Sequence, residues 1–319
     1  MRSTFEKMAA RACNRRVGRA AKSRVPRVAR NPCSRPGAAF RGARVAAATR
    51  GALLGTLGLL IIALAAGGCS RLDIVNSRLG AIGDEQARTI LLDALWAHGS
   101  TYRWVDHANL RAEVTWIEHR ALGDAATEMV WLVDPWANKV RIERPAQRQV
   151  ALADGASVRV YVDGKETADL AARGQAAGDV RLARELLPMP FSLTAAGLEF
   201  EYVGVRLGPA EARVWQRLLV TYRGAAGFGL DNRTVVEVRK DTHRVDNVLI
   251  QWPELPFVAR PMRVEMVEWW DLEGLALSRV WRSVPIDETG KAAATPTYTV
   301  RVKSLAFNAK VAAETFSRP

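Results

Sequence analysis

Four histidines, His98, His107, His119 and His243, are the side chains of this sequence that could bind a metal ion or transfer a proton. Zinc sites place their ligands at short spacings, such as HExxH on a helix or paired cysteines. The sequence has no HExxH or HxH pattern, and no cysteine follows Cys69. We therefore expect no metal site and no cofactor. We interpret the histidines as residues of a helix end, two strand ends and a turn.

Nucleophilic catalysis would need a pattern such as the G-x-S-x-G turn of many hydrolases, which is absent. Ser100 is better explained as a turn residue after a helix. The glycine-rich stretch GAAGFGL, at 224–230, lies between expected strands and so does not open a helix as a phosphate-binding loop does. Glu199 and Glu201 alternate with apolar residues, which is typical of a solvated strand face. We expect that the protein is not an enzyme.

The stretch LLIIALAAGGCS, which ends at Cys69 and Ser70, is the most informative motif. From Gly51 to Gly68 the chain carries no charge, close to the shortest length that crosses a bilayer core of about 30 Å. Small residues, Ala-Gly-Gly, precede the cysteine, as they precede the cleavage point of a processed signal. The stretch resembles a bacterial lipoprotein signal, whose lipobox cysteine receives diacylglycerol and becomes the mature N-terminus. The alternative is a signal-anchor helix with an incidental cysteine.

The cysteine count favours lipidation of Cys69. Cys13 and Cys33 precede the signal, so the mature chain would keep one thiol and could form no internal disulfide. Two or three acyl chains bury enough CH₂ groups, at about 0.8 kcal/mol each, to hold a protein on a membrane. The expected location is the cell envelope, facing the periplasm, with the membrane as a partner. Ser70 rather than Asp after the cysteine favours the outer membrane.

The net charge of +13 comes entirely from the front of the chain. Residues 1–68 hold 14 of the 46 basic residues and one of the 33 acidic ones, so 32 of each remain. A balanced chain is not steered toward phosphate backbones, which excludes nucleic acid as an expected partner. Residues 1–50 are interpreted as a disordered basic presequence, or as sequence ahead of a true start near Val45.

Beyond Cys69 we expect a tether at 70–83 and one folded domain at 84–319. The domain begins with DEQARTILLDALWAHGS, in which apolar residues recur at helical spacing and Gly99 is placed to end the helix. The five expected to face the core are Ala87, Ile90, Leu91, Ala94 and Leu95.

The period then changes from 3.6 to 2, which predicts strands. Examples are LRAEVTW at 110–116, SVRVYVDG at 157–164 and TYTVRVKS at 297–304. Short turn signals separate about eleven strands, and short connections indicate antiparallel pairing. One segment, 165–187, instead predicts two short helices parted around Gly174 to Gly178. The fold class is therefore α+β, with an antiparallel sheet whose apolar face is covered by the N-terminal helix and this insertion.

This layout resembles the LolA and LolB lipoprotein carrier and receptor superfamily, whose strongly curved half-barrel holds acyl chains under a helical plug. Uncharacterised LolA-like outer-membrane lipoproteins share its short motifs. The matching stretches are ALWAHGSTYRW at 94–104, WLVDPWANKVRIER at 131–144, LLPMPFSL at 186–193 and VKSLAFNAKVAAETFSRP at 302–319. The resemblance implies a membrane-anchored, non-enzymatic protein that binds a lipid or another hydrophobic ligand and acts in lipid trafficking or envelope sensing.

All ten tryptophans follow Cys69, more than a compact core needs, and a curved sheet tends to leave an apolar cavity. The candidates for lining a ligand cavity are Trp116, Trp131, Phe200, Leu218, Trp252 and Trp270. The alternative function is a scaffold or receptor module of the envelope that binds a protein partner and has no ligand cavity.

Overall fold

The computed structural model describes residues 70–208, 213–222, 233–250, 261–287 and 290–319. Cys69 and its signal, the stretch GAAGFGL and Trp252 lie outside these ranges. Residues 71–319 make up one unit built on a single antiparallel sheet.

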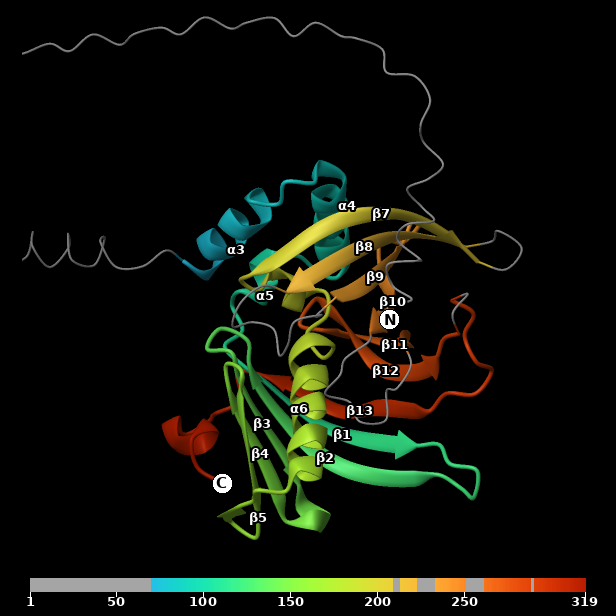
Figure 1. Cartoon of the computed structure of the whole chain (residues 1–319). Coiled ribbons are helices and arrows are strands. Elements are labelled where there is room, and N and C mark those ends of the chain that lie inside the picture. The colour runs from blue at the N-terminus through green and yellow to red at the C-terminus, as the bar shows by residue number, and fades with distance from the viewer. Residues whose placement is uncertain (1–69, 209–212, 223–232, 251–260, 288–289) are drawn as a thin grey trace, which may run out of the picture. The chain divides into compact units, whose positions relative to one another are not determined.

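The sheet has thirteen strands where about eleven were expected, and it does not close into a barrel (Figure 1). The strands are β1 (Leu110–Glu118), β2 (Ala125–Asp134), β3 (Lys139–Arg144), β4 (Gln149–Asp154), β5 (Ser157–Val162), β6 (Lys165–Glu166), β7 (Leu198–Leu207), β8 (Val214–Tyr222), β9 (Arg233–Arg239), β10 (Val245–Ile250), β11 (Met262–Leu272), β12 (Leu275–Pro285) and β13 (Tyr298–Phe307). One of the extra strands, β6, is two residues long and lies inside the segment expected to be helical. The predicted class, a half-barrel of antiparallel strands with helices, is confirmed.

The strand order explains why a helix must cross the concave face. The order runs β6-β5-β4-β3-β2-β1-β13-β12-β11-β10-β9-β8-β7, so β6 and β7 are the two edges of the sheet although they follow each other in the chain. The segment between them has to pass from one edge to the other. It does so as helix α6 (Leu170–Glu185), which lies across the hollow side of the curved sheet (Figure 1).

Helix α6 is one helix, so the prediction of two short helices at 165–187 was wrong. Asp169 caps its start, where a carboxylate oxygen accepts a hydrogen bond from the Ala171 amide at 2.9 Å. Gly174 and Gly178 each cost about 1 kcal/mol inside a helix, but burial of the C-terminal half against the sheet outweighs that cost. From Gly178 to Ala183 every residue is buried.

The N-terminal helix α4 (Glu85–Ala97) is confirmed, and the five residues expected to face the core are the five that are buried. Asp84 caps it by accepting from the Ala87 amide at 3.0 Å. Gly99 follows in a left-handed conformation, with φ of +109°. A Cβ at that position would lie 2.0 Å from the Gly274 carbonyl oxygen, so the turn into the four-residue helix α5 (Thr101–Trp104) needs a glycine.

Most of the expected tether is a helix, α3 (Arg71–Gly80), which corrects the prediction for 70–83. Val75 and Leu79 lie one turn apart on one face and are buried. Helix α3 contacts α4, α5 and the 3₁₀ turn η2 (Phe191–Thr194), where Arg78 donates to the Thr194 carbonyl at 3.0 Å. The stretch 71–80 holds four apolar residues, of which two are buried, and ten residues are too few for an apolar period to identify a packed helix.

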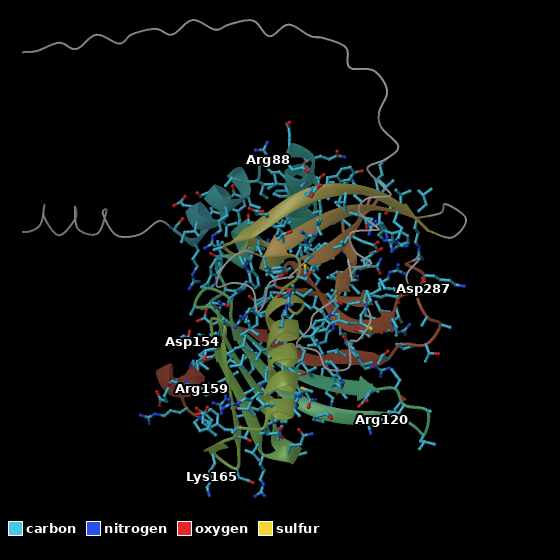
Figure 2. All side chains as sticks on the ribbon, viewed as in Figure 1. Arg88, Arg120, Asp154, Arg159, Lys165 and Asp287 are labelled. Atoms are coloured by element: carbon cyan, nitrogen blue, oxygen red, sulfur yellow. The ribbon has the colours of Figure 1, made fainter. Side chains whose placement is uncertain are left out.

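One hydrophobic core fills the concave side of the sheet. Alternate residues of each strand face it, and four strand pairings carry bulges, which add twist and bend the sheet. Side chains occupy the space between α6 and the strands, while charged residues such as Arg120, Asp154 and Lys165 lie exposed at the rim (Figure 2). The C-terminal 3₁₀ turn η5 (Ala313–Phe316) packs near β3 and β4, where Arg141 donates to the Thr315 carbonyl at 2.9 Å.

Candidate functional site: the concave face beneath helix α6

The predicted cavity residues fall on both arms of the half-barrel. Trp116 and Trp131 lie on β1 and β2, and Leu218 lies on β8; all three are buried in the core. Phe200 on β7 and Trp270 on β11 are half-buried at the margin of the same core. The structure therefore brings five of the six predicted residues to one core, and whether they line a ligand cavity stays a prediction.

Trp131 lies beside a second buried tryptophan. Its ring lies 5.9 Å from that of Trp281 on β12, and the two side chains are 0% and 1% exposed. Neither indole Nε1–H has a hydrogen-bond partner among the described residues. Leaving a buried donor without an acceptor costs about 1–3 kcal/mol. The two rings are neighbours in the core, and each therefore carries a buried donor that calls for an explanation.

The face of α6 that packs against the sheet carries charged residues, which the local sequence pattern did not predict. Asp179 is 2% exposed and forms an ion pair with Arg144 at the end of β3. The same guanidinium donates to the Gln149 side-chain oxygen at 2.6 Å. Burial raises the pKa of Asp179 to about 6, with Arg144 opposing the shift. The carboxyl group is therefore ionised, and the pair intact, at neutral pH.

A second polar contact joins the end of α6 to the opposite arm. Arg181, 0% exposed, donates from Nε to Glu185 at 2.8 Å, and the Tyr222 hydroxyl of β8 donates to the other Glu185 oxygen at 2.8 Å. Burial and the nearby carboxylate raise the pKa of Tyr222 well above its usual value, so the phenol keeps its proton and remains a donor.

These contacts define how α6 is held. Buried ion pairs fix geometry, but the cost of desolvating both partners cancels most of their attraction, so they add little net stability. The apolar part of the interface includes Val180, Leu182 and Ala183 of the helix. The polar contacts therefore fix the position of α6 over the core, and the apolar contacts stabilise it there.

The histidines do not form a site together. His98 is fully buried after α4, where Nδ1 donates to the Ala276 carbonyl at 2.7 Å and Nε2 accepts from the Val245 amide at 3.2 Å. Burial lowers the pKa of His98 to about 4, so the ring is neutral at neutral pH. Within the described ranges, no group of three or more His, Cys, Asp or Glu side chains is arranged to hold a metal ion.

The motifs behind the family resemblance meet in one place, which we call the corner cluster: Trp104, His107, Trp136, Phe191 and Phe307. Trp104 stacks on Phe191 with ring centroids 5.0 Å apart, and the Trp136 indole donates to the His107 carbonyl at 2.7 Å. The His107 ring stacks on Phe307 at 3.9 Å. These residues join α5, the turn after β2, the segment after α6 and the last strand, so the motifs contribute to the packing of the fold.

Solved structures support this architecture. A LolA superfamily protein from Nitrosomonas europaea superposes with a TM-score of 0.51 and 11% sequence identity, covering 73% of this chain and 97% of that one. The chain has the LolA-like fold. A DUF1329 family protein from Desulfovibrio piger aligns with a TM-score of 0.47 and 10% identity, over 72% of this chain and 96% of that one. No protein-family model and no curated protein matches the sequence.

An outer hollow of about 270 Å³ lies between β1–β3 and the C-terminal segment. Its lining combines charged side chains, Arg111, Arg141, Glu143 and Lys310, with apolar ones such as Val130 and Leu132. None of the described helices is long and apolar enough to cross a membrane.

Proposed function

We propose that the protein is a non-enzymatic binding protein of the bacterial envelope that holds a lipid or another hydrophobic molecule in its half-barrel. The observation that carries the proposal is the pair of unpartnered indole donors, Trp131 and Trp281, in the concave core of a LolA-like fold. A lipid with an ester or carboxyl group supplies both an apolar chain for the core and an acceptor for these donors.

Helix α6 serves as the lid in this mechanism. Because the inward side chains already pack against it, a ligand enters by taking the place of α6 rather than by filling a preformed space. When α6 leaves, Asp179, Arg181 and Glu185 regain hydration, which offsets the loss of their ion pairs. The ligand in turn removes its apolar surface from water, which contributes roughly 25 cal/mol per Å².

A fluorescent fatty acid tests this proposal. We expect the probe to bind residues 70–319 and to be displaced by unlabelled fatty acid. The Trp131→Phe and Trp281→Phe variants should each weaken binding roughly fivefold, since one neutral hydrogen bond contributes about 1 kcal/mol. Trp96→Phe is the matched control, because that side chain is 73% exposed on α4 and should not affect binding. Equal loss in all three variants would argue against a site at the indole pair.

Anchoring through acyl chains on Cys69 is part of the proposal. We expect Cys69→Ser to abolish incorporation of labelled palmitate and to move the protein from the membrane fraction to the soluble fraction. Cys33→Ser is the control and should leave both unchanged, because that residue precedes the signal. Retention of the Cys69→Ser protein in the membrane fraction would favour the signal-anchor helix instead. Separating the two membranes by density tests the proposed outer-membrane location.

A protein-binding role is the second candidate, and one observation favours it. Leu92 and Trp96 lie one turn apart on the outer face of α4, 44% and 73% exposed, and Tyr102 of α5 is 60% exposed. Exposed aromatic residues are enriched at protein interfaces. A stoichiometric partner captured by the native protein and lost with Trp96→Ala would support this role, particularly if no lipid binds.

A further inference from the structure

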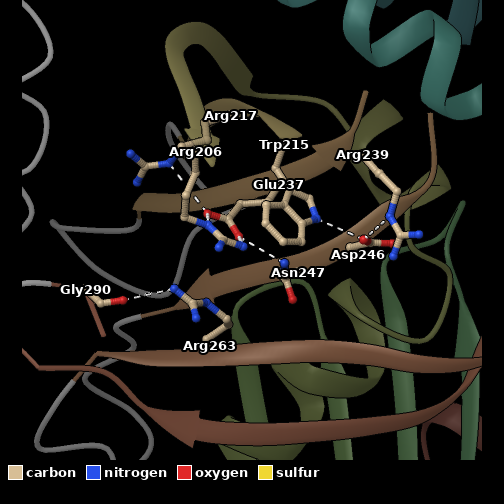
Figure 3. Close-up of polar contacts among 9 residues, drawn as sticks. All are labelled: Arg206, Trp215, Arg217, Glu237, Arg239, Asp246, Asn247, Arg263 and Gly290. Carbon is tan, nitrogen blue, oxygen red and sulfur yellow. Dashed lines mark hydrogen bonds and ion pairs between the residues drawn. The ribbon is translucent and has the colours of Figure 1, made fainter. Parts of the chain in front are cut away.

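A group of arginines lies on the outer face of the sheet, away from the concave core. Arg206 of β7, Arg217 of β8 and Arg263 of β11 surround Glu237 of β9 (Figure 3). We call these four residues the outer arginine cluster. Their direct neighbours along the strands, such as Leu218, face inward, and alternation along a strand places the cluster on the opposite side.

One arginine satisfies the only carboxylate of the cluster. Arg206 donates from Nε and from one Nη to the two Glu237 oxygens, at 2.7 and 2.6 Å, in the two-pronged geometry typical of strong pairs. The Asn247 amide also donates to Glu237, at 3.0 Å. Glu237 is 0% exposed, so its charge is neutralised within the protein.

The other two arginines are left with little compensation. Arg217 Nε lies 3.7 Å from a Glu237 oxygen, beyond hydrogen-bond distance, and Arg263 donates to the Gly290 carbonyl at 3.0 Å. Both Nε atoms are buried and have no hydrogen-bond partner among the described residues. Burial lowers the pKa of both side chains; attraction to Glu237 opposes this shift, and repulsion from Arg206 adds to it. The cost of holding these cations here would fall if an anion joined them.

Among the described residues, the neighbouring charges leave the cluster with an excess of positive charge. The cluster holds three guanidinium groups and one carboxylate, a net charge of +2. Beside it, Arg239 donates to Asp246 at 2.6 Å, which makes a neutral pair. Glu265, on the same face of β11, attracts Arg263 and also lies opposite Arg282 of β12, which adds a further positive charge. The ring of Trp215 stacks beneath Arg206 at 3.8 Å and holds that guanidinium in place.

We propose that the outer arginine cluster binds a phosphate group, contacted by Arg217 and Arg263. A phosphate monoester carries close to two negative charges at neutral pH, which matches the net charge of the cluster. Its oxygens accept hydrogen bonds from more than one guanidinium at once. The group belongs either to a soluble phosphate ester or to the headgroup of a phospholipid. This site is separate from the concave face, so it can be present or absent whatever the half-barrel binds.

Calorimetric titration with inorganic phosphate, at constant ionic strength, tests the site in the full-length protein. We expect binding in the wild type and a loss of roughly tenfold in affinity for Arg217→Gln and for Arg263→Gln, because each removes a charged hydrogen-bond donor. Arg217→Lys keeps the charge but loses the planar fork, so its affinity should be intermediate. Arg111→Gln is the control: this arginine is exposed on β1, pairs with Glu113 at 3.0 Å, and should not alter binding.

Vesicles distinguish the two sources of the phosphate group. Sedimentation with vesicles that contain phosphatidic acid, whose headgroup is a phosphate monoester, is compared with sedimentation with pure phosphatidylcholine. It should show a difference between the wild type and Arg217→Gln/Arg263→Gln if the headgroup is the ligand. Residues 1–68 are common to all variants, so their positive charge does not contribute to this difference. Circular dichroism checks that each variant is folded. Two negative results together would overturn the proposal: the wild type binds inorganic phosphate no more strongly than the double variant, and it binds acidic vesicles no more strongly than the double variant.

Discussion

Replacing Asp179 by Ala is expected to lower the free energy of unfolding by about 3–5 kcal/mol, the usual cost of removing one partner of a buried ion pair. The substitution leaves the Arg144 guanidinium buried, 4% exposed, with Gln149 as its remaining side-chain partner. Helix α6 then loses its main polar contact with β3. Urea denaturation followed by circular dichroism measures the change.

Two controls separate this effect from a general loss of charge. Asp163→Ala removes the partner of Arg148 in a pair that is largely exposed on both sides, and should cost no more than about 1 kcal/mol. The double variant Arg144→Met/Asp179→Leu replaces the buried pair with apolar side chains and should recover most of the stability. If Asp179→Ala lowered the free energy of unfolding no more than Asp163→Ala does, the ion pair would not be the contact that positions α6.

Replacing His98 by Gln should cost about 3 kcal/mol at pH 7.5, the second large effect. The imidazole satisfies the Ala276 carbonyl and the Val245 amide simultaneously, and each buried group left without a partner costs about 1–3 kcal/mol. The ring also lies edge-on to Trp269, with centroids 4.7 Å apart, so the substitution loses an aromatic contact. His243→Gln is the matched control, since that side chain lies in a turn and is half-exposed.

His98 also makes the stability of the protein depend on pH. The folded-state pKa of about 4 lies below the unfolded value of 6.5, so the unfolded chain binds more protons between these limits. Stability should therefore fall as the pH drops from 6.5 to 4, by about 3 kcal/mol from this residue. Asp179 has the opposite effect on stability. Its folded-state pKa of about 6 lies above the unfolded value of 3.8, so between these limits the folded protein binds more protons and stability rises as the pH falls. The difference between wild type and His98→Gln isolates the histidine, and an unchanged slope would contradict the assignment.

Local patterns predicted much of the fold. The apolar period of 84–100 predicted α4 and each of its core residues, because a strong period and a glycine placed to end the helix agree. Alternation predicted the strands and, through short connections, their antiparallel pairing. The corner cluster was present in the sequence as separate motifs, and the family resemblance correctly linked them to a LolA-like fold before their contacts were known.

Features that depend on distant contacts could not be predicted from the sequence. The glycines of α6 led to the prediction of two short helices. The single helix is stabilised by its packing against the sheet, which the local sequence does not show. The partner of Asp179 is Arg144, 35 residues away, and no local pattern indicates that pairing. The outer arginine cluster combines residues of β7, β8, β9 and β11. Its net charge can be counted only when the pairing register of these strands is known.

The central claim, that the half-barrel takes up a hydrophobic ligand, is tested most directly by native mass spectrometry. Residues 70–319, produced in bacteria without the signal, would be measured as purified and after addition of fatty acid or phospholipid, with the bound material extracted and identified. We predict a complex with about one lipid per protein, at reduced occupancy in Trp131→Phe/Trp281→Phe. A ligand-free mass that stays unchanged after lipid is added would contradict the account and favour the protein-binding role of the exposed α4 surface.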